Sequence, residues 1–203
     1  MRLSIVATAA FAGLALAGCT TPVRNGPVEV TRFVQPSAPL GQGTIFVESA
    51  PGADTDSLAL APYKAAIARE LAALGYVEAP RGEAGQVAQV RVEKFRSEGL
   101  ERRRGPVSVG VGGSTGSYGS GVGLGVGINL GGGGSGETLD TQLGVMIRDR
   151  VSGETFWEGR AQLSVSPNSP FADTEANASA IADALFREFP GNNGETVEVR
   201  VTE

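Results

Sequence analysis

The side chains able to do chemistry are few in this 203-residue chain. It has no histidine, two lysines and one cysteine, Cys19. Without histidine there is no Ser-His or Cys-His nucleophile pair and no imidazole ligand for a metal. Neither Lys64 nor Lys94 follows a serine at the Ser-x-x-Lys spacing. Asp54 and Asp56 leave carboxylate chemistry as an alternative, but their loop-like stretch is typical of solvated turns, so we expect no enzyme.

Two short glycine motifs match catalytic or cofactor-binding patterns, but neither has the context that its chemistry needs. Gly131, Gly133 and Gly136 fit G-x-G-x-x-G, yet a strand pattern follows instead of the helix whose N-terminus would bind a pyrophosphate. Residues 112–116 fit the G-x-S-x-G of hydrolase elbows, again without a following helix or a histidine to activate the serine. Both matches are expected by chance in so glycine-rich a stretch, and no cofactor is predicted.

Cys19 ends the first hydrophobic run of the chain. Arg2 precedes an alanine-rich apolar run over residues 3–16, which is shorter than the about 20 residues that a transmembrane helix needs. The run has the size and flanks of a secretory signal. A secreted chain with one free thiol would be open to unwanted intermolecular disulfides, and conversion of that thiol to a thioether removes the hazard. An ordinary signal peptide with a chance cysteine is the alternative.

Residues 16–19 read Leu-Ala-Gly-Cys and resemble the lipobox of bacterial lipoproteins. The resemblance implies removal of residues 1–18, diacylglycerol on the Cys19 thiol and acylation of the new N-terminus. More than one acyl chain anchors a protein stably, at about 0.8 kcal/mol per buried CH2 group. Residues 20–22 read Thr-Thr-Pro and lack the aspartate that resembles an inner-membrane retention signal. By analogy with sorted lipoproteins we expect the outer membrane, with the domain facing the periplasm.

The chain divides into three parts on this reading: a signal peptide over residues 1–18, a tether over residues 19–27 and one domain over residues 28–203. The domain is long enough for a hydrophobic core of its own. Removal of the signal takes away Arg2 and changes the formal charge from −5 to −6. An acidic surface has no general attraction to nucleic acid. The expected partners are the membrane, through the lipid, and an envelope protein or a second copy.

Hydrophobic periodicity predicts an α+β fold. Alternating apolar residues, many of them β-branched, indicate strands over residues 28–34, 44–48, 87–95, 138–149, 157–165 and 197–201. Residues 62–74 and 171–189 instead repeat apolar side chains at steps of three and four, as amphipathic helices do. We expect a mostly antiparallel sheet with both helices packed on one face.

Individual residues support these boundaries. The expected buried stripes are Tyr63, Ile67, Leu71 and Leu74 on the first helix and Ala178, Ile181, Leu185 and Phe189 on the second. Gly75 is the expected left-handed cap at the end of the first helix. Ser152 and Gly153 are a hairpin turn signal, and Trp157 shares the buried register of the strand that follows.

Glycine makes up 15 of the 32 residues over 105–136. Valine, leucine and isoleucine alternate with it over residues 107–111 and 122–130, which predicts a β-hairpin insertion with one glycine face. This hairpin would cover part of the second face of the sheet or leave that face solvated. Just before it, residues 102–104 are three arginines, which could contact phosphate or acidic glycan but are more simply explained as a solvated turn.

Two blocks carry a family resemblance. Residues 136–149 read Gly-Glu-Thr-Leu-Asp-Thr-Gln-Leu-Gly-Val-Met-Ile-Arg-Asp, and residues 152–161 read Ser-Gly-Glu-Thr-Phe-Trp-Glu-Gly-Arg-Ala. With Leu-Gly-Tyr at 74–76 and Phe-Pro at 189–190, they resemble the bacterial lipoproteins catalogued as domain of unknown function 4136, over residues 28–190. The resemblance implies a periplasm-facing lipoprotein with an α/β domain, no established activity and no catalytic residues.

Three functions remain open at this point. The first is a non-enzymatic binding or assembly module of the envelope. The second is a structural protein whose Gly-rich hairpins associate into an oligomer or a membrane-inserted ring. Membrane-spanning strands need about 9–11 residues, which residues 122–130 approach and residues 107–111 do not. A hydrolase is the third.

Overall fold

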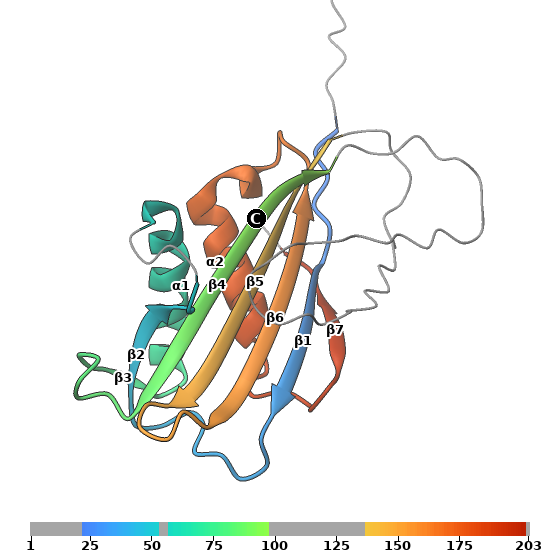
Figure 1. Cartoon of the computed structure of the whole chain (residues 1–203). Coiled ribbons are helices and arrows are strands. Elements are labelled where there is room, and N and C mark those ends of the chain that lie inside the picture. Colours follow the sequence, from blue (N-terminus) through green and yellow to red (C-terminus); the bar gives the residue numbers. More distant parts are fainter. Residues whose placement is uncertain (1–21, 53–56, 98–136, 202–203) are drawn as a thin grey trace, which may run out of the picture.

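The computed structural model describes residues 22–52, 57–97 and 137–201. These residues form one seven-stranded sheet with two helices packed on one of its faces (Figure 1). Cys19 and the expected Gly-rich hairpin at 105–136 lie outside the described residues. None of the helices within these ranges is long and apolar enough to cross a membrane.

The strands lie side by side in the order β3-β2-β4-β5-β6-β1-β7. Their bounds are β1 (Val28–Val34), β2 (Thr44–Ser49), β3 (Val77–Glu78), β4 (Gln86–Ser97), β5 (Thr138–Asp149), β6 (Thr155–Val165) and β7 (Thr196–Val199). The helices are α1 (Ala61–Ala73) and α2 (Thr174–Phe186), and each follows a short 3-10 turn, η1 (Leu58–Leu60) and η2 (Pro170–Ala172). An α+β fold with two helices on one face is therefore confirmed.

The sheet is mixed, which corrects the expectation of a mostly antiparallel one. β2 pairs in parallel with both β3 and β4, whereas the remaining strands pair with antiparallel neighbours. The reason is that α1 lies between β2 and β4 in the chain, and a helical crossover is the connection that parallel neighbours need. β3 was not expected at all, because a two-residue strand is too short to show alternation.

The hydrophobic core lies between the helices and the inner face of the sheet. Tyr63, Ile67 and Leu71 of α1 and the predicted stripe of α2 from Ala178 to Leu185 are buried there. Trp157 of β6 is fully buried, and its ring packs 5.4 Å from that of Phe186 and 5.3 Å from that of Phe189. The expected core role of this tryptophan is confirmed.

The second helix is shorter at both ends than predicted. Its N-terminus is set by Asp173, whose carboxylate accepts hydrogen bonds from the backbone N–H groups of Glu175 and Ala176. Such a cap satisfies N–H groups that have no partner within the helix. At the other end the helix stops at Phe186, so that Phe189 packs on Trp157 from the following loop.

Candidate functional site

Among the described residues, no helix packs on the second face of the sheet, and we call it the open face (Figure 1). Strand alternation directs odd-numbered positions of β5 and β6 toward the helices and even-numbered positions away from them. The open face therefore carries Glu29, Thr31 and Phe33 of β1, Gln89, Arg91, Glu93 and Phe95 of β4, Gln142, Gly144, Met146 and Arg148 of β5, and Glu158, Arg160, Gln162 and Ser164 of β6. These side chains are predominantly polar.

A shallow depression of about 410 Å³ lies at the centre of the open face. Gly144 forms its floor, because a side chain is missing there and the space that a Cβ would occupy is empty. Strand register places Arg91 on one side of this glycine and Arg160 on the other. Thr31 follows Arg160 in the same row. Two guanidinium groups thus flank a position where a ligand can approach the backbone of the sheet.

Both guanidinium groups are paired, but only at the solvent-exposed surface. Arg160 donates through Nε and Nη2 to Glu158 Oε1 at 2.9 and 2.6 Å. The Arg91 Nη1 and Glu93 Oε1 atoms are 3.9 Å apart. Exposed ion pairs of this kind contribute about 0–1 kcal/mol each. Both arginines can therefore exchange their present partners for an anionic group of a ligand at little cost.

The neighbouring row of the depression is made of amides and carboxylates. Strand pairing aligns Glu93 with Gln142, then Gln162, then Glu29. Glu198 of β7 stands directly opposite Glu29. Across the part of the chain that the structure describes, no hydrogen bond or ion pair engages either of these two carboxylates. The depression therefore offers a row of guanidinium and hydroxyl groups beside a row of amides and carboxylates, an arrangement suited to holding a polar ligand by hydrogen bonds.

A second hollow, of about 320 Å³, lies near the N-terminus of α2. Lys94 Nζ donates to Thr174 Oγ1 at 3.1 Å and lies 5.2 Å from the centre of the Tyr63 ring. Burial lowers the pKa of Lys94, against the opposing effect of the Asp173 carboxylate. Burial also raises the pKa of Tyr63 to about 12, and its hydroxyl donates to Asn177 Oδ1 at 2.8 Å. These groups bond to one another and hold the two helices against the sheet.

Asp140 is a buried carboxylate at the same end of the sheet. It accepts hydrogen bonds from the hydroxyls of Ser97 at 2.6 Å, Thr138 at 3.3 Å and Ser164. These partners belong to β4, β5 and β6, so the carboxylate ties three strands together at their ends. Its role is structural.

The sites predicted from sequence and the depression do not coincide. Cys19, Asp54 and Asp56 lie outside the described residues. Within the described ranges no three His, Cys, Asp or Glu residues gather as a metal ion would require. Sequence reasoning missed Arg91 and Arg160, which look like ordinary solvated charges in the strands that contain them. Only the register across three strands shows that they flank a glycine.

The fold and the open face define a class: an α+β module in which, among the described residues, helices cover one sheet face and the other face is predominantly polar. The chain belongs to the family described as Domain of unknown function (DUF4136), whose model matches residues 34–191. This match confirms the family resemblance carried by the blocks at 136–149 and 152–161.

Individual relatives are distant. An uncharacterised protein of Zymomonas mobilis subsp. mobilis is 31% identical over 62 residues, which are 30% of this chain and 23% of that protein. A PDZ domain protein from Parabacteroides distasonis is similar in structure, with a TM-score of 0.51 and 13% identity over 86% of this chain and 39% of that one. The PelC dodecamer from Paraburkholderia phytofirmans gives a TM-score of 0.45 and 12% identity over 78% of this chain and 94% of that one. The likeness to the Parabacteroides protein concerns the fold alone.

Proposed function

We propose that the protein is a lipid-anchored lipoprotein of the outer membrane that faces the periplasm and acts as a non-enzymatic binding or assembly module. Membership of the DUF4136 family and the lipobox-like residues 16–19 support the proposal. The observation that carries the binding function is the depression on the open face, between Arg91 and Arg160.

Two features of the open face favour binding over a purely structural role. Its side chains are polar, so the sheet can expose it to water without loss of stability until a partner arrives. The depression falls within the range of volumes found for ligand sites, roughly 300–1,000 Å³. Its lining includes no pair of nucleophile and general base, and the chain has no histidine that could activate its serines or threonines. These features support a binding module and not a hydrolase.

The test fills the floor of the depression. Gly144→Trp puts a large side chain between the two arginines, whereas Gly82→Trp puts the same side chain on an exposed turn that does not line the depression. Both glycines have open space where a Cβ would be added, so both variants should fold. The lipidated proteins are purified from detergent-solubilised envelopes, and their co-purifying components are quantified by mass spectrometry.

We expect wild type and Gly82→Trp to retain the same partner and Gly144→Trp to lose it. Thermal unfolding of all three proteins controls for misfolding. Retention of every co-purifying component by Gly144→Trp would show that the open face is not the binding surface.

A further inference from the structure

We infer that the domain stands end-on on the lipid surface, resting on the end of the sheet that carries Phe95 and Arg96, so that the open face rises away from the bilayer. The inference rests on the proposed lipid anchor at Cys19. It follows from where the tether joins the domain, from what lies at that end and from the charges on the open face.

The tether is held at the end of β6. The backbone N–H of Arg24 donates to Ser166 Oγ at 2.9 Å, and that of Gly26 donates to the carbonyl oxygen of Ser164 at 2.9 Å. Asn25 forms an isolated bridge with Val165. Cys19 precedes Arg24 by five residues, which span at most about 18 Å when fully extended. The lipid surface therefore lies near this end of the domain.

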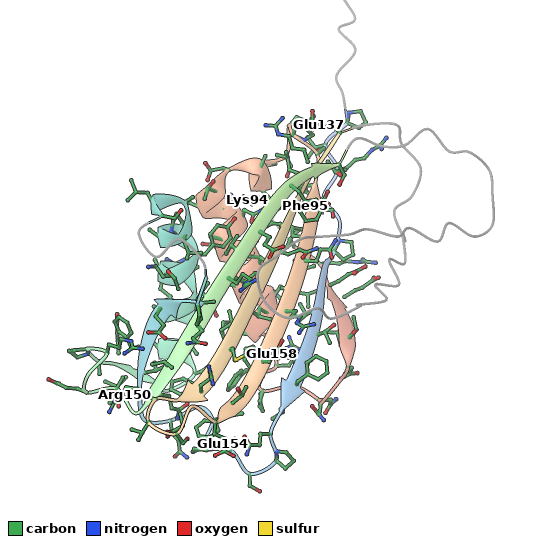
Figure 2. All side chains as sticks on the ribbon, viewed as in Figure 1. Lys94, Phe95, Glu137, Arg150, Glu154 and Glu158 are labelled. Atoms are coloured by element: carbon green, nitrogen blue, oxygen red, sulfur yellow. The ribbon has the colours of Figure 1, made fainter. Side chains whose placement is uncertain are left out.

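Three strands, β4, β5 and β6, meet at this end. The last residue of β4, Ser97, pairs with Thr138 at the start of β5, and Leu139 pairs with Val165 at the end of β6. Figure 2 shows Lys94, Phe95 and Glu137 toward this end and Arg150 and Glu154 at the opposite one. The twelve residues of β5 span about 40 Å, so the opposite end lies beyond the reach of the tether.

The side chains at the anchored end suit a membrane interface. Phe95 is 43% exposed although it is a large apolar residue. On the opposite face of the same strand end, Arg96 donates to Glu137 at 2.7 Å, and Arg24 of the tether lies beside the end of β6. Phenylalanine rings can insert at the boundary between the headgroups and the acyl chains of a bilayer, and arginine side chains can extend to its phosphates.

The open face itself is poorly suited to lying flat on lipid. Glu29 and Glu198 stand opposite each other on it and lack neutralising partners among the described residues. Glu93 and Glu158 add two further carboxylates, each offset by one exposed arginine. Contact with an anionic headgroup layer would bring like charges together and remove water from unpaired carboxylates. An upright domain avoids both costs and leaves the depression at Gly144 accessible from the periplasm.

The upright arrangement also determines which end of the domain carries the two residues that flank the undescribed segment 98–136. Ser97 and Glu137, between which residues 98–136 run, both belong to the anchored end. The two described residues that flank the Gly-rich part of the sequence therefore lie beside the lipid surface and not beside the far end of the open face.

The test compares two phenylalanines of the open face that differ mainly in their distance from the anchored end. Phe33 is 42% exposed, against 43% for Phe95. Strand pairing aligns Phe95 with Ser164 of β6, through β5, and aligns Phe33 with Glu158 of β6. Ser164 and Glu158 are six residues apart, which is about 20 Å along the strand. Phe95→Cys and Phe33→Cys are made in the full chain and labelled with a nitroxide. The only native thiol, Cys19, is consumed by lipidation.

The labelled lipoproteins are reconstituted into vesicles of phosphatidylethanolamine and phosphatidylglycerol. Power-saturation electron paramagnetic resonance measures collisions of each label with oxygen, which concentrates in lipid, and with a water-soluble nickel chelate. We expect the label at 95 to collide several-fold less with the chelate and more with oxygen than the label at 33. Circular dichroism melts confirm that both variants fold.

Each other outcome overturns the inference. Shielding of both labels would mean that the open face lies flat on lipid, and full exposure of both would mean that the domain moves freely on its tether. The intact mass separates these failures from failure of the proposed function. If the protein carries acyl chains and the two labels have equal collision rates, only the end-on orientation is contradicted. If the protein carries no acyl chains, the anchor and the orientation are contradicted together.

Discussion

Arg32 is a charged residue in a strand position where an apolar one is expected. It follows Val28 and Val30 on the inner face of β1 and is only 4% exposed. Its Nε donates to the carbonyl oxygen of Leu185 at 3.0 Å, and its Nη2 donates to those of Ala184 at 3.1 Å and Arg187 at 2.6 Å. The last carbonyls of a helix have no partner within it and carry partial negative charge. Arg32 therefore caps the C-terminus of α2 from the sheet.

The electrostatic setting of Arg32 agrees with this role. Burial lowers the pKa of its guanidinium, and the carboxylates of Glu188 and Glu195 act in the opposite direction. The guanidinium keeps its charge because an arginine pKa starts so high. A cation is thus kept where the helix terminus favours one.

The first prediction is that Arg32→Met destabilises the domain by roughly 2–3 kcal/mol, because buried carbonyls lose charged donors. Urea unfolding of a soluble form starting at Thr20 measures this change. The same substitution at Arg91, whose side chain is largely exposed, should alter the unfolding free energy by less than about 0.5 kcal/mol. Equal midpoints for the two variants would contradict the capping role.

The second prediction concerns the anchor. Cys19→Ser removes the thiol that would carry diacylglycerol, so the protein should lose its lipid and move from the membrane fraction to the soluble one. Metabolic labelling with a fatty-acid probe measures the modification directly. Equal labelling of wild type and variant would rule out Cys19 as the lipidated residue.

At the scale of elements, α1 determines that the sheet is mixed. It begins after η1 with Pro62 in its first turn, where the missing N–H is harmless. It ends before Gly75, whose φ of +104° is a left-handed conformation that suits glycine. A Cβ there would also approach the carbonyl oxygen of Gly41 to 2.8 Å. The helix crosses from β2 to β4, and its buried side holds the parallel edge of the sheet.

The third prediction tests that packing. Leu71 of α1 is fully buried, so Leu71→Ala should cost about 2–5 kcal/mol of unfolding free energy through lost burial and the cavity left behind. Leu58 of η1 is 87% exposed and provides the matched control, because the same atoms are deleted where they contact water. Denaturant melts of both variants measure the difference. An unchanged midpoint for Leu71→Ala would mean that α1 does not pack as described.

At the scale of the whole molecule, shortening the Gly-rich segment distinguishes a self-associating protein from a monomeric binding module. β4 and β5 already pair along their full lengths up to Ser97 and Thr138. The fourth prediction is that replacing residues 106–136 by a short Gly-Ser linker leaves the domain folded. Analytical ultracentrifugation of the lipidated protein in detergent then reports its association.

The two functional alternatives predict different association states for the intact protein. Self-association through the Gly-rich segment predicts that the intact protein sediments as an oligomer and the shortened one as a monomer. A binding module predicts that both sediment as monomers. If the shortened protein unfolds, both alternatives misjudge the segment, because it would then belong to the core.

Much of this architecture was determined by local sequence. The strand at 28–34, the hairpin at 138–165 and the stripe through Tyr63, Ile67 and Leu71 follow from apolar periodicity, and the structure places each of them as predicted. Periodicity records which side of an element meets the core, and that information is local. The lipobox-like residues 16–19 likewise stand on sequence alone, since they lie outside the described residues.

Only the tertiary structure decided which strands are neighbours. The parallel pairing of β2 and β4, the capping of α2 by Arg32 and the placement of Gly144 between Arg91 and Arg160 all join residues far apart in the chain. The sequence of a strand shows only which of its own side chains share a face. It does not show which residues of other strands lie beside a polar residue on the open face. Register across the sheet is a long-range property, set when the strands pack on a common core.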